Sequence, residues 1–286
     1  MKVLVTGASG MLGTAIIDEL KHLGDVVGTY NSRPVEGMVH LAISSQESIL
    51  QLLAQLQPDV VIHAAAIRSP DLCRELTPEL QAINIDSARW VAEWVSENHK
   101  YMVHISSDSL FDGTAPPYTE TSEPNPINIY GKTKLEAERS LGAFIDKVSI
   151  LRLPVLYSRK TLHESTMTSY FPDIAAAKPI ALDNWGIRVP TAVQDVAKAI
   201  LKLVETRSPG LYQFSGNQTT TKYAVGVAVS EKLGVDPSLL TPVEGASGAV
   251  ARAKDCTLVK SSFFADISTT SLIEDLPLLL SLVPGA

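Results

Sequence analysis

The 286-residue chain lacks a cysteine framework, an excess of positive charge and any zinc-type cluster, and each absence excludes a class of protein. Only two cysteines are present, Cys73 and Cys256, so several disulfides are excluded and a reduced, cytoplasmic setting is expected. No cysteine–histidine spacing suits zinc, which predicts no metal site. The net charge of −7, without a basic run, argues against a nucleic-acid surface.

Long hydrophobic runs are also missing. The run "LPLLLSLV" near the C-terminus is far too short to span a bilayer, so no membrane partner is expected. A strand-like segment starts at Lys2, and this leaves no room for a signal peptide before it. The length is sufficient to bury a full core.

What the chain does contain is a regular alternation of strands and helices. Strands are expected at 3–5, 25–30, 59–66, 101–107 and 148–157, and helices at 11–24, 45–57, 80–98 and 129–142. Because the strands are almost continuously apolar, they predict a parallel sheet covered on both faces, which is a doubly wound α/β (Rossmann) fold.

The pattern loosens after Tyr157, and this predicts a second, smaller unit. We expect a dinucleotide-binding domain over 1–157, to which 189–215 returns with a helix at 191–205 and a strand at 210–216. A mixed C-terminal substrate lobe is expected over 158–188 and 216–286.

The stretch "VLVTGASGMLGTAII" places Gly7, Gly10 and Gly13 between the first strand and a helix that begins near Met11. Such a turn aims backbone N–H groups and the positive end of a helix dipole at a pyrophosphate. Gly7 would make the turn, Gly10 would admit the cofactor, and Gly13 would let the helix pack on the sheet. The alternative is a glycine turn with a purely structural role.

Three side chains in the middle of the chain suit carbonyl reduction. Tyr130 and Lys134 are four residues apart and share one face of a helix, so the ammonium group can favour the phenolate and lower the pKa of Tyr130. Ser107 ends the strand at 101–107, at the edge of the sheet where ligands bind. In an arbitrary helix, Tyr130 and Lys134 would instead be an ordinary surface pair.

The motifs "TGASGMLG", "HISSDSLFDG" and "YGKTKLEAE" resemble the extended short-chain dehydrogenase/reductase superfamily. Within it, the chain resembles the dTDP-4-dehydrorhamnose reductase branch and the related regulatory beta subunit of methionine adenosyltransferase, up to about residue 235. The resemblance implies that Ser107, Tyr130 and Lys134 are catalytic and that Asn84 completes a water and proton relay. Alternatively, Asn84 is a structural polar residue in its helix. The resemblance also permits a homodimer.

The residues after the second strand bear on the choice of cofactor. No acid follows there to bind ribose hydroxyls, while Asn31, Ser32 and Arg33 are available for a 2′-phosphate, so NADP(H) is expected. In the alternative, Arg33 is a solvated loop charge. The expected cofactor-binding residues are Gly7, Ser9, Gly10, Met11, Leu12, Gly13, Asn31, Ser32, Arg33, Ala64, Ala65, Ala66, Lys134 and Leu153.

The expected substrate-binding residues are Asp108, Ser109, Trp185 and Arg188. Rhamnose-type reductases carry a tyrosine where this chain has Ser109, so an aromatic residue is missing. Arg188 suits a diphosphate or carboxylate, and Trp185 either stacks on a ring or packs at the lobe interface.

These features lead to two hypotheses about function. The first is an NADP(H)-dependent reductase acting on a ketone of a nucleotide-linked sugar or another small carbonyl compound, with Tyr130 as general acid. The alternative is an NADP-binding regulatory subunit that docks on methionine adenosyltransferase. His63, after an apolar strand, is interpreted as structural rather than catalytic.

Overall fold

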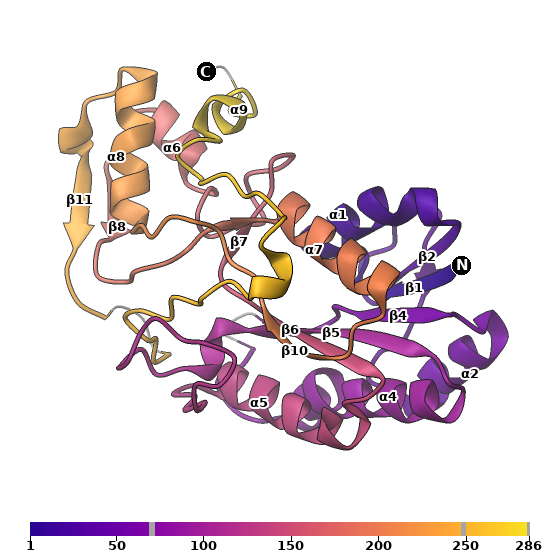
Figure 1. The fold of residues 1–286 in the computed structure, drawn as a ribbon. Helices are drawn as coiled ribbons and strands as arrows, with labels where there is room; N and C mark the ends of the chain where they lie inside the picture. The colour runs from indigo at the N-terminus through magenta and orange to yellow at the C-terminus, as the bar shows by residue number, and fades with distance from the viewer. Residues whose placement is uncertain (69–71, 247–249, 285–286) are drawn as a thin grey trace.

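The computed structural model describes residues 1–68, 72–246 and 250–284. It shows a larger α/β domain around one central sheet and a smaller lobe to one side of it (Figure 1). None of the helices in these ranges is long and apolar enough to cross a membrane.

The central sheet has seven strands in the order β10-β6-β5-β4-β1-β2-β3, and every neighbouring pair is parallel. The strands are β1 (Lys2–Thr6), β2 (Asp25–Tyr30), β3 (Val39–His40), β4 (Val60–His63), β5 (Tyr101–Ser107), β6 (Val148–Leu153) and β10 (Gly210–Gln213). Strands β4 and β6 are buried throughout, as expected when helices cover both faces. The predicted doubly wound α/β fold is confirmed.

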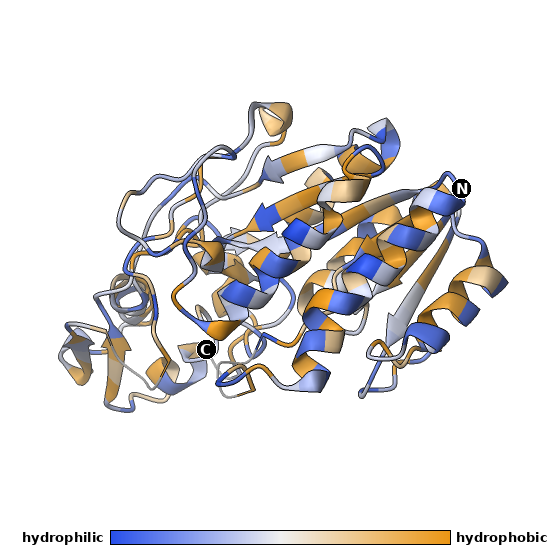
Figure 2. Cartoon of the chain, turned by 90° about the horizontal axis from the view of Figure 1, so that it is seen from below, coloured by the Kyte–Doolittle hydropathy of each residue, from blue (hydrophilic) through white to orange (hydrophobic). Residues whose placement is uncertain are grey.

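Helices cover the two faces of the sheet (Figure 1). One face carries α1 (Met11–Leu20) and α7 (Val193–Thr206), and the other carries α2 (Gln46–Leu56), α4 (Ser87–Glu97) and α5 (Ile129–Leu141). On α7, Val196, Ile200 and Leu203 recur at helical spacing and are fully buried against the sheet. Figure 2 shows such apolar positions as hydrophobic stripes along helices that are otherwise hydrophilic.

The order of the strands reverses at β1, and this reversal locates the ligand crevice. From β1 the chain builds β2 and β3 on one side, then crosses to β4, β5, β6 and β10 on the other. The pairings Thr6 with His63 and Ser107 with Leu153 bring the carboxyl ends of these strands to one edge. In open α/β sheets, ligands bind at this reversal, outside the carboxyl ends.

Two expected elements are interrupted in the structure. The helix expected at 80–98 consists of α3 (Pro78–Gln81), a π-helical turn η2 (Ala82–Asp86) and then α4. The strand expected at 148–157 splits into β6 and β7 (Leu156–Tyr157) at Pro154, which has no N–H group for the sheet ladder. β7 pairs instead with β9 (Thr191–Ala192).

The smaller lobe has its own core, centred on Tyr157, Phe171, Val225 and Leu276. Its elements are α6 (Phe171–Ala175), β8 (Ile180–Asp183), α8 (Lys222–Leu233), β11 (Leu240–Val243) and α9 (Leu276–Leu280), and β8 and β11 form a two-stranded parallel sheet. In the described part of the chain, the 3-10 helices are η1 (Lys21–Leu23), η3 (Asp108–Leu110), η4 (Gly142–Phe144), η5 (Pro237–Leu239) and η6 (Ser262–Phe264).

One part of the C-terminal segment 216–286 does not join the lobe as expected. The backbone N–H of Ser261 donates to the carbonyl of Gln213 at 2.9 Å, alongside the edge strand β10. Phe264 packs edge-to-face on Phe214, with ring centroids 5.4 Å apart, inside the core of the sheet domain. This part of the tail covers an open sheet edge, and it therefore belongs with the larger domain.

Candidate active site

A cavity of about 1070 Å³ opens at the carboxyl edge of the central sheet and is also lined by loops of the lobe. The expected site residues that line it are Gly7, Ser9, Gly10, Met11, Leu12, Gly13, Asn31, Ser32, Arg33, Ala64, Ala65, Ala66, Ser107, Asp108, Ser109, Tyr130, Lys134, Leu153 and Arg188. Asn84 and Trp185 lie outside this lining. The fold thus brings together most of the residues expected to serve cofactor, catalysis and substrate.

In the glycine turn after β1, neighbouring backbone leaves no room for a side chain at Gly7 or Gly13. Gly7 has a φ of +69°, and a Cβ there would lie 2.9 Å from the backbone of Ala65. A Cβ on Gly13 would lie 2.3 Å from the carbonyl oxygen of Gly7. A Cβ on Gly10 would meet only Gly7, at 3.4 Å, so this glycine is open on the cavity side.

The amino end of α1 faces the same cavity without a side-chain cap. Gly10 is the N-cap residue, and no side chain accepts a hydrogen bond from the first turn. Unsatisfied N–H groups at a helix start attract anions. The open backbone at Gly10 and this uncapped turn fit the pyrophosphate of a dinucleotide.

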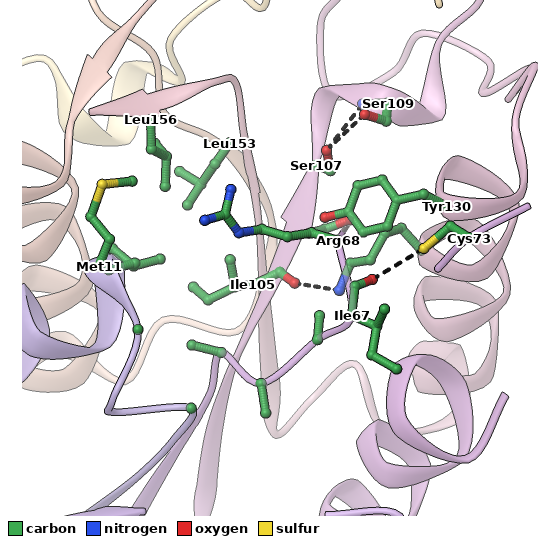
Figure 3. Close-up of a pocket in the computed structure, with 18 of the residues that line it drawn as sticks. Met11, Ile67, Arg68, Cys73, Ile105, Ser107, Ser109, Tyr130, Leu153 and Leu156 are labelled. Carbon is green, nitrogen blue, oxygen red and sulfur yellow. Dashed lines mark hydrogen bonds between the residues drawn. The ribbon is translucent and has the colours of Figure 1, made fainter. Parts of the chain in front are cut away.

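The carboxyl end of β5 and the start of α5 position the expected catalytic side chains. Asn128 caps α5 by accepting a hydrogen bond from the N–H of Gly131 at 2.8 Å. A Cβ on Gly131 would lie 2.1 Å from the carbonyl oxygen of Ser109, so a glycine is needed for this close approach. Tyr130 and Ser107 therefore lie on adjoining elements, and the Tyr130 hydroxyl is directed toward the middle of the cavity (Figure 3).

Lys134 is buried and anchored to β5. Its Nζ donates to the carbonyl oxygen of Ile105 at 2.6 Å and lies 3.2 Å from His104 Nε2. Burial lowers the pKa of Lys134 to about 8, and the charge of Glu138 opposes this shift. At neutral pH the ammonium form is retained at the base of the cavity.

The pKa of Tyr130 differs from the expectation. Burial raises it to about 12, and a hydrogen bond with Ser107 only partly offsets that effect. The lysine four residues away on α5 directs its ammonium group to the backbone of β5, so the expected lowering by Lys134 is not seen. The phenol therefore stays protonated through neutral pH.

Asp108 forms a small polar network with the serines on either side. Ser107 Oγ donates to Asp108 Oδ1 at 3.2 Å, and Ser109 Oγ donates to the same oxygen at 3.4 Å. Burial raises the pKa of Asp108 to about 6, while the charge of Arg188 and these hydrogen bonds lower it. Ser109 occupies the position where rhamnose-type reductases carry an aromatic residue, and here its hydroxyl is hydrogen-bonded to the carboxylate of Asp108.

The side chain of Asn84, in the π-helical turn η2, is hydrogen-bonded to the loop after β4 and to α5. Its Oδ1 accepts from the N–H of Ile67 at 2.8 Å, and its Nδ2 donates to the carbonyl of Ile67 at 2.9 Å and to Thr133 Oγ1 at 3.1 Å. These bonds hold the loop after β4 against α5. They favour the structural interpretation of this side chain, and the relay stays a prediction.

Trp185 is also placed differently from the expectation. It is partly buried beside a turn in which the N–H groups of Trp185 and Gly186 both donate to Asp183 Oδ1 at 2.9 Å. This turn presents Arg188, and not the indole, to the cavity. The geometry favours the packing alternative for Trp185.

His63 is satisfied inside the sheet domain, in agreement with the structural interpretation. Its ring nitrogens lie 3.1 Å from Thr6 Oγ1 and 3.0 Å from Ser87 Oγ. Burial, followed by the charge of Lys134, lowers the pKa of His63 to about 3, so the ring is neutral.

Three charged residues that line the cavity are not among the site residues expected from the sequence. Arg68 follows the alanines after β4 and extends into the cavity (Figure 3), and Glu164 and Arg252 reach it from loops of the second half of the chain. For Arg68, its place directly after a predicted strand was an available signal. Glu164 lies in a segment without a recognisable motif, and Arg252 lies after residue 235, where the resemblance to the family is weakest. Among the described residues, no group of three or more His, Cys, Asp or Glu side chains could hold a metal ion.

Comparisons with known proteins identify the family of this chain. Residues 1–273 match the family model described as the RmlD substrate binding domain. The methionine adenosyltransferase 2 subunit beta of Xenopus tropicalis is 36% identical over 250 residues, covering 85% of this chain and 75% of that protein.

Two solved structures are similar over almost the whole chain. A hypothetical dTDP-4-dehydrorhamnose reductase from Sulfolobus tokodaii superposes with a TM-score of 0.83 at 28% identity, covering 96% of this chain and 99% of the other. The dTDP-4-dehydrorhamnose reductase of Bacillus anthracis, solved in complex with NADP, gives a TM-score of 0.85 at 25% identity, covering 98% of each chain.

Proposed function

The chain belongs to the RmlD substrate binding domain family, and on this premise we propose that it is an NADP(H)-dependent reductase acting on a ketone of a nucleotide-linked sugar. One observation carries the proposal. A single cavity is lined by the open glycine turn, by Ser107, Tyr130 and Lys134, and by Arg188 and Arg252.

The proposed cofactor is NADP(H), as in the Bacillus anthracis structure. The open backbone at Gly10 and the uncapped first turn of α1 suit the pyrophosphate, and Arg33 lines the cavity where a 2′-phosphate would be held. When bound, NADPH supplies the hydride for the carbonyl carbon. The small side chains of Ala64, Ala65 and Ala66 leave space beside the turn.

Tyr130 is the proposed general acid. With a pKa of about 12 it carries its proton at neutral pH, so it can donate to the carbonyl oxygen as negative charge develops there. Ser107 is placed to hydrogen-bond the same oxygen. Lys134, cationic below pH of about 8 and bonded to the carbonyl oxygen of Ile105, is the residue proposed to orient the ribose of the cofactor.

The cationic end of the cavity supports a diphosphate-containing substrate. Arg188 and Arg252 line it, and burial, together with the charges of both arginines, lowers the pKa of the half-buried Lys222. Planar guanidinium groups bind phosphate oxygens in pairs. The proposed substrate therefore places its ketone at Tyr130 and its diphosphate toward these arginines.

The test is transfer of deuterium from 4-deuterated NADPH to a panel of ketones headed by dTDP-4-keto-6-deoxysugars, with mass spectrometry of the products. The proposal expects label in a reduced sugar nucleotide, and labelling about 10²- to 10⁴-fold slower with the Tyr130→Phe variant. Product formation at the wild-type rate by Tyr130→Phe would refute the assignment of the acid. No label from any sugar nucleotide, with NADPH bound, would refute the substrate class.

A second function is favoured by the likeness to the beta subunits, of which several vertebrate examples are 34–36% identical to this chain. In this alternative, the chain binds NADP(H) and docks on a methionine adenosyltransferase as a regulatory subunit. A pull-down with the synthetase of the same organism tests it. A stable complex, together with no ketone reduction, would favour this function over the first.

A further inference from the structure

Segment 158–166, which follows β7 and is here called the strap, connects the lobe to the cofactor end of the cavity. Lys160 of the strap forms an ion pair with Asp18 on α1. Glu164 of the strap lines the cavity and is contacted from both sides of β1. Arg33, after β2, places its Nη2 3.4 Å from Glu164 Oε1, and Arg68, after β4, donates to the Glu164 carbonyl oxygen at 3.2 Å.

Because β2 and β4 flank β1 in the sheet, these two contacts hold Glu164 across the carboxyl end of β1. That end carries the glycine turn, and Arg33 also donates to the backbone carbonyl of Ser9 within the turn. Arg33 is therefore engaged with acceptors of the protein itself. Its carboxylate partner belongs to a segment more than 120 residues away in the sequence.

The Glu164 carboxylate and a 2′-phosphate are both anionic acceptors for the same guanidinium group. Two anions sharing one cation repel each other, so occupancy by one disfavours the other. We propose that Glu164 competes with the 2′-phosphate for Arg33 and so determines how strongly the chain distinguishes NADP(H) from NAD(H). The inference rests on the proposed function, in which Arg33 holds the 2′-phosphate.

The competition is expected to affect the binding of NADPH but not the binding of NADH. Binding of NADPH must break the contact between Arg33 and Glu164, whereas NADH, which has no 2′-phosphate, leaves it intact. The wild-type carboxylate therefore weakens NADPH binding and has no effect on NADH binding. The Arg33 side chain is 60% exposed, so the contribution is that of a solvated ion pair, about two- to fivefold in affinity.

The experiment is isothermal titration calorimetry of NADPH and NADH with the full chain and four variants. Glu164→Gln is expected to bind NADPH about two- to fivefold more tightly and NADH as the wild type does. Arg33→Gln is expected to weaken NADPH binding about tenfold or more and to leave NADH binding unchanged. In the variant with both substitutions, Glu164→Gln should no longer have an effect on NADPH.

Asp18→Asn is the matched control, since it removes a different ion pair of the strap, that between Lys160 and Asp18, without touching Arg33. It should affect both cofactors equally. A further check is salt, because higher ionic strength should reduce the difference between Glu164→Gln and the wild type.

The proposal that Arg33 holds the 2′-phosphate and the proposal that Glu164 competes for Arg33 are contradicted by different results. If Arg33→Gln affects NADPH and NADH equally, the cofactor role of Arg33 is wrong and the competition falls with it. If Arg33→Gln is selective but Glu164→Gln changes both affinities equally, or neither, the cofactor role of Arg33 stands and the competition is overturned.

Discussion

The two ends of the cavity are built by different means. At the proposed cofactor end, backbone segments approach so closely that a Cβ on Gly7 or Gly13 would collide with neighbouring main chain. At the proposed substrate end, charged side chains such as Arg188 and Arg252 reach in from loops. A backbone-built site tolerates few residues at its key positions, whereas a side-chain-built site can change its specificity without disturbing the fold.

The largest expected effect tests the steric nature of the cofactor end. A Cβ on Gly13 would lie 2.3 Å from the Gly7 carbonyl oxygen and 2.5 Å from Ala8 Cα, so Gly13→Val must move α1 away from β1. We expect a loss of about 3 kcal/mol of stability or more, measured by thermal unfolding. Gly142→Ala, at a helical position with no atom within 4 Å of the added Cβ, is the control and should melt close to the wild type. Equal melting of the two variants would contradict the comparison.

The next effect concerns the junction of the two ends, where Tyr130 lies. Tyr130→Phe removes only the hydroxyl, and turnover should fall about 10²- to 10⁴-fold because the carbonyl oxygen loses its proton donor. Cofactor affinity should be unchanged. Tyr223→Phe, on α8 and outside the cavity lining, is the matched control in steady-state assays and should turn over at the wild-type rate.

A smaller effect is expected at the substrate end. Arg188→Ala should raise KM about tenfold or more with little change in the affinity for NADPH, since a charge-assisted hydrogen bond is worth about 1.5–3 kcal/mol. Arg139→Ala removes an exposed arginine that pairs with Glu136 on α5 and should leave KM unaltered. If Arg188→Ala weakened NADPH and substrate binding alike, the division of the cavity into two ends would be incorrect.

The smallest effect is expected in the pH dependence of kcat/KM, which reports the protonation of Asp108 and Lys134. Below pH of about 6, Asp108 gains a proton and no longer accepts fully from Ser107, so the rate should fall. Above pH of about 8, Lys134 loses its charge and the rate should fall again. Asp108→Asn should abolish the acidic limb and keep the basic one. A profile of the variant identical to that of the wild type would show that Asp108 does not control the acidic limb.

Much of the sheet domain could be predicted because its signals are local. Buried parallel strands appear as short apolar runs, and the glycines after β1 mark a turn whatever lies around it. The break of the strand after Leu153 could be read from Pro154, but its consequence, the pairing of β7 with β9, could not. That pairing joins segments more than thirty residues apart.

The candidate site was predictable to the extent that its residues belong to regular elements. Ser107 ends a strand, and Tyr130 and Lys134 share a helix face, so their proximity to the cavity followed from the order of the elements. Glu164 and Arg252 lie in irregular segments, where no periodicity indicates direction. Asn84 could be placed in its helix, but the π-helical turn that directs its amide to Ile67 could not be foreseen.

The sequence by itself determined the doubly wound architecture, the glycine turn and the set of Ser107, Tyr130 and Lys134, because periodicity, chain order and the absence of a Cβ are local properties. The tertiary structure alone decided the protonation of the site and its contacts across the lobe. Burial raises the pKa of Tyr130 above its ordinary value although a lysine stands four residues away. Likewise, Arg33 meets Glu164 only because the strap folds back over β1. Desolvation and long-range contacts depend on what surrounds a residue in space, which its neighbours in the chain do not specify.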